Sequence, residues 1–327
     1  MAIIEVKNLS KKFKVKTKEK GLKGSLKSIF KPKFKTINAV KNISFEVEKG
    51  EIIAFIGPNG AGKSTTIKML TGILFADSGS VEVMGINPTK NRKKLAYEIG
   101  TVFGQKEQLW MHLTPYDNFK FFSAIYDIPN SVAEKRIDNL KMLFELDEFI
   151  DTPVRNLSLG QRIRCEIVAS LIHEPKVLFL DEPTIGLDPV VKENIRTLIK
   201  RMNKELKTTI FLTSHDVGDI EKLCKRVIII NDGKIVMDDS MENLKYHYLN
   251  KKIVEAKMKE KVNLDEKSGL TILKDKGYNL KIEVDTKIKS IADAIKLLDP
   301  DKIVDINISN TPLEDIISDI YKNEDKS

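Results

Sequence analysis

The stretch that decides the fold reads Gly57-Pro58-Asn59-Gly60-Ala61-Gly62-Lys63-Ser64. It matches the phosphate-binding loop G-x-x-x-x-G-K-S, in which glycines let backbone N–H groups turn inward around a polyphosphate. We expect an apolar strand from Glu51 to Ile56 before the loop and a helix from Ser64 to Leu74 after it. That helix directs its positive dipole end at the same anion. The motif predicts a nucleotide site in which Lys63 reaches the β- and γ-phosphates and Ser64 holds Mg²⁺.

A second motif follows the apolar stretch from Val177 to Leu180, which runs directly into Asp181 and Glu182. In enzymes with this phosphate-binding loop, an Asp at a strand end helps to hold Mg²⁺. A carboxylate directly after it can orient or activate a water for attack on the γ-phosphate. The sequence has no N-K-x-D motif for reading guanine and no obvious lid or acceptor site of a kinase. We therefore expect an ATP and Mg²⁺ site, with Asp181 as metal ligand and Glu182 as a catalytic residue.

Strands and helices alternate through the first two thirds of the chain. Apolar strand patterns recur at Ile99 to Phe103, at Val177 to Leu180 and at Thr209 to Leu212, and a helix is expected from Pro189 to Leu206. This alternation predicts an α/β core with a mostly parallel sheet. From about residue 105 to 172 the pattern becomes helical, which predicts a helical subdomain inserted into that core.

The basic residues are concentrated in one segment. Between Lys11 and Lys35 there are eleven lysines and one acid, Glu19, which give the segment a charge of +10. The whole chain carries +8, so the remainder carries −2. We interpret residues 11–35 as a basic insertion between strands at Ile3 to Lys7 and Val40 to Val47, with a short amphipathic helix using Leu22, Leu26, Ile29 and Phe30. Because the charge does not extend over a domain face, no nucleic-acid partner is expected.

The last quarter of the chain has its own pattern. Residues 251–327 alternate apolar and polar positions, as at Val254, Ala256 and Met258, and then show helical spacing from Ile291 onward. We expect a small α+β domain there that regulates the protein or helps it to dimerise. Residues 241–250 are expected to be a linker, and residues 1–240 to form the nucleotide-binding domain with an antiparallel β subdomain beside the core.

Five further motifs resemble those of the ATP-binding cassette (ABC) ATPases. Leu157-Ser158-Leu159-Gly160-Gln161 resembles the family signature L-S-G-G-Q, with Leu159 in place of its first glycine. The stretch from Asp181 to Asp188 resembles the acidic strand end and the D-loop. The remaining matches are single residues, namely the Q-loop Gln105, the switch His215 and an aromatic at the adenine position, Phe13. The motifs follow the family's order over about residues 3 to 240.

The resemblance implies a head-to-tail dimer that holds two ATP molecules between its subunits. Each ATP would lie on the phosphate-binding loop of one chain and under the signature of the other. Catalytic roles would fall to Glu182 as the base, His215 on the γ-phosphate, Lys63, and Gln105, which also reaches Mg²⁺ together with Ser64 and Asp181. The other nucleotide-binding residues implied are Phe13, Gly57, Pro58, Asn59, Gly60, Ala61, Gly62, Thr65, Thr66, Leu157, Ser158, Leu159, Gly160, Gln161 and Asp188.

The chain as a whole resembles ATPase subunits of bacterial export systems with separately encoded permeases. No apolar stretch approaches the roughly 18 residues needed to cross a bilayer, and the N-terminus has no pattern of a signal peptide. We therefore expect a protein at the cytoplasmic face of the membrane, held there by permease subunits and paired with an identical or related ATPase subunit. The alternative is a soluble ABC ATPase of a cytosolic assembly, such as iron–sulfur cluster biogenesis.

Overall fold

The computed structural model describes residues 2–17, 33–104, 106–248, 250–260 and 270–324. These residues form two compact units, Met1–Asp238 and Asp239–Ser327, and each unit is described by itself. No helix among the described residues has the length and apolar character that a bilayer crossing requires.

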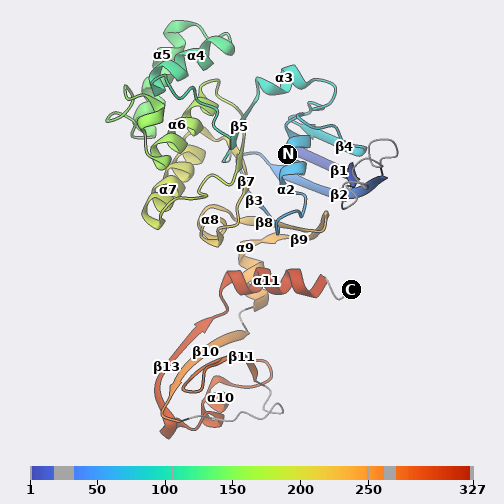
Figure 1. Cartoon of the computed structure of the whole chain (residues 1–327), viewed down its shortest axis with the longest axis vertical. Helices are drawn as coiled ribbons and strands as arrows, with labels where there is room; N and C mark the ends of the chain where they lie inside the picture. The colour runs from blue at the N-terminus through green and yellow to red at the C-terminus, as the bar shows by residue number, and fades with distance from the viewer. Residues whose placement is uncertain (1, 18–32, 105, 249, 261–269, 325–327) are drawn as a thin grey trace, which may run out of the picture. The chain divides into compact units, whose positions relative to one another are not determined.

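A six-stranded sheet forms the centre of the first unit (Figure 1). Its strand order is β5-β6-β7-β3-β8-β9, and the pairs β5–β6, β6–β7, β7–β3 and β3–β8 are all parallel. The strands are β3 (Ile52–Ile56), β5 (Ile99–Phe103), β6 (Val177–Asp181), β7 (Thr209–Thr213), β8 (Arg226–Asn231) and β9 (Lys234–Ser240). This confirms the predicted α/β core with a mostly parallel sheet.

An antiparallel sheet of order β2-β1-β4 packs on this core. Its strands are β1 (Ala2–Thr17), β2 (Lys33–Glu48) and β4 (Ser78–Val83). The two sheets share a cluster of phenylalanines, because the ring of Phe45 on β2 lies 5.7 Å from that of Phe55 and 6.1 Å from that of Phe211. Apolar burial of this size is the main stabilising contribution to the core.

Strands β1 and β2 are longer than the sequence predicted, and they take in both ends of the basic insertion. Lys12 pairs with Asn38, Phe13 with Ile37, and Lys16 with Phe34. The alternation Lys-Phe-Lys-Val-Lys has the period of two that a strand requires, so the insertion cannot be treated as a segment separate from the strands. The predicted amphipathic helix at residues 22–30 lies outside the described residues.

Helices surround the parallel sheet, and α4, α5 and α6 gather at one end of the unit (Figure 1). Helix α7 matches its predicted bounds, because the Asp188 carboxylate accepts hydrogen bonds from the N–H groups of Val190 and Val191 and Pro189 begins the helix. Helix α2 begins at Lys63 and ends at Leu70, short of the predicted Leu74; Gly72 follows with a φ of 71°. The helices are α2 (Lys63–Leu70), α3 (Arg92–Ala96), α4 (Pro115–Ile125), α5 (Asn130–Leu143), η1 (Val154–Asn156), α6 (Leu159–Leu171), α7 (Pro189–Leu206) and α8 (Val217–Leu223).

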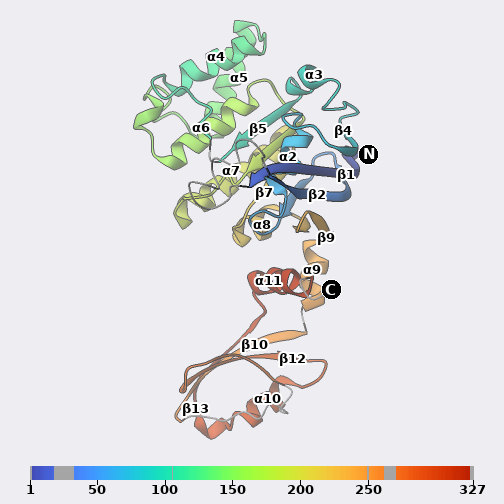
Figure 2. The ribbon, with the colours of Figure 1, turned by 45° about the vertical axis from the view of Figure 1, so that its right-hand side comes forward.

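The second unit is an antiparallel sheet of order β11-β12-β10-β13 with helices (Figure 2). Helix α10 covers one face of the sheet, since Ala294 and Leu298 are buried with Val254, Ile282 and their neighbours. The stretch expected as a linker forms helix α9 instead, because Met241 and Leu244, one turn apart, are buried. The elements are α9 (Met241–Tyr248), β10 (Lys251–Met258), β11 (Thr271–Asp275), β12 (Asn279–Asp285), α10 (Ile291–Leu297), η3 (Pro300–Lys302), β13 (Ile303–Asn310) and α11 (Leu313–Glu324).

Candidate functional site

The phosphate-binding loop joins the carboxyl end of β3 to helix α2. Gly60 and Gly62 have φ angles of 85° and 110°, in the left-handed region that favours glycine. A Cβ on Gly62 would also lie 2.4 Å from the carbonyl oxygen of Ala39 on β2. No side chain caps the helix at Gly62, so its first N–H groups remain available to an anion. The sequence therefore builds a loop suited to phosphate.

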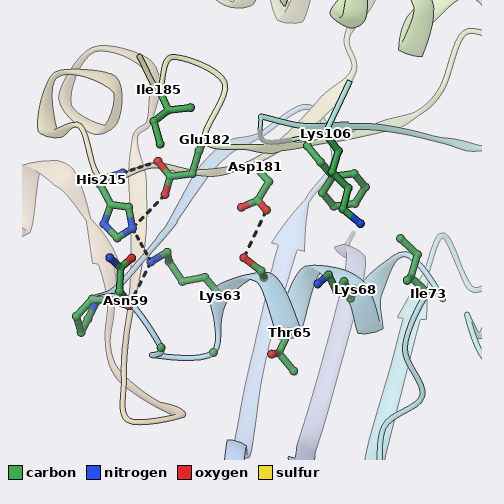
Figure 3. Close-up of a pocket in the computed structure, with 15 residues that line it drawn as sticks. Asn59, Lys63, Thr65, Lys68, Ile73, Lys106, Asp181, Glu182, Ile185 and His215 are labelled. Atoms are coloured by element: carbon green, nitrogen blue, oxygen red, sulfur yellow. Dashed lines mark hydrogen bonds and ion pairs between the residues drawn. The ribbon is translucent and has the colours of Figure 1, made fainter. Parts of the chain in front are cut away.

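A pocket of about 510 Å³ opens over this loop (Figure 3). The predicted site residues that it brings together are Pro58, Asn59, Gly60, Gly62, Lys63, Ser64, Thr65, Asp181, Glu182 and His215. Two lining lysines, Lys68 and Lys106, were not predicted. Lys68 follows Ser64 by four residues on α2, so helical spacing alone could have indicated it. The additional positive charges suit a ligand that carries several phosphates.

Lys63 is anchored in the pocket by main-chain carbonyl groups of its own loop. Its ammonium donates hydrogen bonds to the carbonyl oxygens of Gly57 at 2.6 Å and Pro58 at 3.3 Å, and it lies 3.1 Å from Nε2 of His215. Burial lowers the pKa of Lys63, while the charges of Glu182 and Asp181 oppose that shift. The loop carbonyls therefore hold the ammonium end of Lys63 in the pocket, where it can contact the terminal phosphates.

Asp181 and Ser64 provide oxygens suited to Mg²⁺. The Ser64 hydroxyl donates to Oδ2 of Asp181 at 3.4 Å, and the hydroxyl of Thr213 on the neighbouring strand donates to Oδ1. A hydroxyl and a carboxylate at the phosphate end of the pocket fit the usual environment of Mg²⁺, which takes few protein oxygens and completes its octahedron with phosphates and water. Within the described ranges, no three His, Cys, Asp or Glu side chains converge as a metal cage, and Mg²⁺ bound in this way does not need one.

Glu182 follows Asp181 with a φ of 58°, a conformation that is strained for this residue type. Its carboxylate accepts a hydrogen bond from the main-chain N–H of His215 at 3.1 Å. Burial raises the pKa of Glu182, and His215 and Lys63 oppose the shift. Among the described residues, the buried Oε1 has no aligned hydrogen-bond donor, although Nε2 of His215 lies 3.3 Å away. Oε1 therefore has lone pairs that no described donor occupies, as an atom that takes up a proton requires.

A buried ionic network lies behind Glu182 and His215. Asp219 on α8 is fully buried and accepts hydrogen bonds from Thr184, from Ser214 at 2.7 Å and from Nε of Arg196 at 2.7 Å. Nη2 of Arg196 also donates to Asp216 at 2.8 Å. Because Ser214 directly precedes His215 and Thr184 lies two residues after Glu182, the network fixes both strand ends. The sequence analysis did not identify Arg196 or Asp219.

The signature residues lie outside this pocket. Ser158 caps helix α6, and it forms a capping box with Gln161 in which the Ser158 N–H donates to Oε1 of Gln161 at 2.9 Å. Leu159 begins the helix with ordinary geometry and is 41% exposed, so no glycine conformation is needed at this position. Gly160 is constrained, because a Cβ there would lie 2.5 Å from Cγ1 of Val191 on α7. The signature thus exposes Ser158 and a helix N-terminus away from the chain's own phosphate-binding loop.

The remaining predicted residues differ in how the structure places them. Phe13 lies on β1, on the same face of the β1–β2 pair as Lys11. Lys11 pairs with Val40 on β2, and Val40 packs near Gly62 of the phosphate-binding loop. Phe13, Ala61, Thr66, Leu157 and Asp188 do not line the pocket, and the Asp188 carboxylate caps α7. Gln105 lies outside the described residues.

Comparison with known proteins adds to this geometry. The family model described as ABC transporter matches residues 40–185. The ABC transporter ATP-binding protein NatA of Bacillus subtilis (strain 168) is 32% identical over 215 residues, which cover 66% of this chain and 87% of NatA. The linearmycin resistance ATP-binding protein LnrL of the same organism is 38% identical over 60% of this chain and 63% of LnrL. The ABC transporter A family member 1 of Dictyostelium discoideum is 35% identical, but the match spans only 26% of that protein.

Solved structures of ABC transporter cassettes are also similar to this chain. CbiO1 from Clostridium perfringens, described as part of the ABC transporter complex cbiONQ, has a TM-score of 0.63 at 30% identity over 74% of this chain and 90% of its own. The ATP-binding cassette MJ0796, solved as a dimer in a post-hydrolysis state with ADP and Pi, has a TM-score of 0.60 at 25% identity. That match covers 73% of this chain and 98% of MJ0796.

Proposed function

Because the chain belongs to the ABC transporter family, we propose that its ATP hydrolysis drives export through a separately encoded membrane permease. ATP binding and hydrolysis, with Mg²⁺, are the activity of this family's ATPase domain. The observation that carries the proposal is the convergence of Lys63, Asp181, Glu182 and His215 on one phosphate-binding pocket. The soluble assembly alternative is not favoured, since NatA is named as an ABC transporter ATP-binding protein and CbiO1 is described as part of an ABC transporter complex.

The proposed roles follow from the contacts. Lys63 and the α2 N-terminus hold the β- and γ-phosphates, and Ser64 and Asp181 hold Mg²⁺ between them. Glu182 accepts the proton of the attacking water through Oε1, and His215 contacts the γ-phosphate beside Lys63. Phosphoryl transfer depends mainly on positioning and charge neutralisation, which this set of side chains supplies without a covalent nucleophile.

The site is completed by a second subunit in this proposal. Ser158 and the N-terminus of α6 are exposed and uncommitted to the chain's own pocket. In a head-to-tail dimer, they would face the γ-phosphate held by the other chain's loop, in agreement with the dimeric structure of MJ0796. Phe13 would lie against adenine, and Gln105 would connect the Mg²⁺ site to the permease.

The proposals that the protein drives export and that it binds a permease rest on two further observations. LnrL is named for resistance to linearmycin, and another relative, YbhF of Escherichia coli, is named as a probable multidrug transporter protein. On the helical end of the first unit, Trp110 is 55% exposed and packs on Phe121 with ring centroids 4.7 Å apart. An exposed aromatic side chain that rests on a second, half-buried ring suits the centre of a protein interface, and we assign it to the permease at the cytoplasmic face of the membrane.

The test is a pull-down from detergent-solubilised membranes with tagged Glu182→Gln protein in the presence of ATP. This substitution should slow hydrolysis and hold the dimer closed around ATP. A polytopic membrane protein that co-purifies at near-equal stoichiometry supports the proposal, and Trp110→Ala should weaken its recovery. A dimer with only cytosolic partners would contradict the transporter role while leaving the ATPase activity in place.

A further inference from the structure

The far half of the β1–β2 pair forms a two-stranded ribbon that the nucleotide site does not use. Strand β4 pairs with β1 only as far as Ser10, so beyond that point β1 has β2 as its partner among the described residues. We define the basic ribbon as Lys12–Lys16 and its partners Phe34–Asn38. A two-stranded ribbon presents both of its faces to its surroundings, and each face can therefore have a separate role.

The register assigns different side chains to the two faces. Phe13 pairs with Ile37 and Val15 with Lys35, which places these residues on the face that also carries Lys11. Lys12, Lys14 and Phe34 belong to the opposite face, with Thr36 and Asn38. Lys12, Lys14, Phe34, Thr36 and Asn38 are all exposed, and Phe34 is 60% exposed. The second face is thus an aromatic side chain among lysines, turned away from the residue expected to contact adenine.

The charge of the ribbon is not neutralised within the described chain. Residues 11–17 and 33–38 contain six lysines and no acid. Lys11 forms an ion pair with Asp77 at 2.8 Å, whereas Lys12, Lys14 and Lys35 have no ion pair among the described residues. An exposed cluster of like charges around an apolar side chain costs free energy unless a complementary surface covers it.

We propose that the face bearing Lys12, Lys14 and Phe34 lies against an anionic lipid surface. Binding at the surface of an anionic membrane is strengthened by apolar side chains that enter the interface and by basic residues near the headgroups, and this face supplies both. A nucleic acid fits less well, because duplex binding uses many phosphate contacts and the chain outside the basic insertion carries −2. The inference rests on the proposed function only in that a transporter subunit works beside a membrane.

The test uses the full-length protein and vesicles without any permease. Sedimentation should show binding to vesicles of phosphatidylglycerol and phosphatidylcholine but not to phosphatidylcholine alone, and the binding should weaken as salt is added. Lys12→Gln/Lys14→Gln should lower the partition coefficient roughly twenty-five-fold, at about fivefold for each lysine. Phe34→Ser should weaken binding at every salt concentration. The matched control, Lys257→Gln/Lys274→Gln, removes the same charge from exposed positions of the second unit and should bind like the wild type.

Three results would overturn the inference. The first is equal binding of the wild type to both kinds of vesicle, and the second is an equal loss for the ribbon and control variants. The third is tighter binding to duplex DNA than to anionic vesicles at the same ionic strength, which would assign the ribbon to nucleic acid. Solution ATPase activity checks that each variant is folded. Because the vesicles contain no permease, failure of this test and failure of the permease pull-down are separate outcomes.

Discussion

His215 and Glu182 meet at the ends of neighbouring strands, where the main-chain N–H of His215 donates to the Glu182 carboxylate at 3.1 Å. The strands β6 and β7 are parallel, with Asp181 opposite Thr213, so their carboxyl ends reach the same edge of the sheet. The His215 ring then lies 3.1 Å from the ammonium of Lys63. Lys63 is thereby brought together with two residues that lie more than a hundred positions further along the chain, Glu182 and His215.

Glu182→Gln should stop hydrolysis without stopping ATP binding. Glutamine keeps the shape of the side chain and its acceptor for the His215 N–H, but it cannot take a proton from water. We expect turnover to fall roughly 10²- to 10⁴-fold, the usual contribution of general base catalysis. Phosphate release and nucleotide binding are measured side by side, with Glu193→Gln, an exposed carboxylate on α7, as the control. Unchanged turnover in the Glu182 variant would remove this residue from the catalytic role.

Gly160→Ala should impair the signature helix, and Val191→Ala should restore it. The added Cβ would lie 2.5 Å from Cγ1 of Val191, whereas the next nearest atom, the Val191 Cβ, is 3.8 Å away. Such overpacking costs about 1–3 kcal/mol. The melting temperature and ATPase activity of the single and double variants test the contact. If the double variant is no better than Gly160→Ala alone, Val191 is not the reason that glycine is required.

Arg196→Ala should destabilise the first unit strongly. The change leaves the fully buried carboxylate of Asp219 without its cation, and removal of one partner from a buried ion pair costs about 3–5 kcal/mol. The control is Arg201→Ala on the same helix, whose ion pair with Glu205 is exposed and should contribute about 0–1 kcal/mol. Thermal unfolding compares the two variants. Equal melting temperatures would show that the network behind His215 does not stabilise the fold.

Glu166→Gln should stabilise the protein in a manner that depends on pH. Burial on α6 raises the pKa of Glu166 to about 7, from 4.5, so the folded state holds its proton after the unfolded chain has lost it. The folded state therefore loses stability as the pH rises from about 4.5 to 7, up to about 3 kcal/mol in total. Glutamine resembles the protonated form at every pH. The variant should melt close to the wild type at pH 5 and above it at pH 8, and an equal difference at both values would contradict the assignment.

Much of the site could be predicted because it is encoded locally. The phosphate-binding loop and the Asp181-Glu182 strand end are contiguous motifs, and the backbone geometry that they need follows from glycines and from strand order. Helix α7 was bounded correctly, since an N-cap Asp and a following Pro define its start. These features depend on few long-range contacts.

Features that depend on tertiary contacts were missed. Arg196 and Asp219 form a network only when α7 and α8 pack together, and nothing in their local sequence distinguishes them from solvated charges. The extent of β1 and β2 was underestimated because lysines dominate the composition there, although their period of two indicates a strand. Helix α9 was not predicted because the stretch is mostly polar, and among its described side chains Met241 and Leu244 are the buried apolar ones.

The most direct test of a catalytic site shared between two chains is a mixing experiment. Lys63→Ala protein lacks a working phosphate-binding loop and Ser158→Arg protein lacks a working signature, so each should be inactive alone. In a head-to-tail dimer of the two, one of the two sites combines an intact loop with an intact signature. We predict that mixing the two inactive proteins restores ATP hydrolysis to a substantial fraction of the wild-type rate. If the mixture stays inactive while a heterodimer is detected, the signature of one chain does not complete the site of the other.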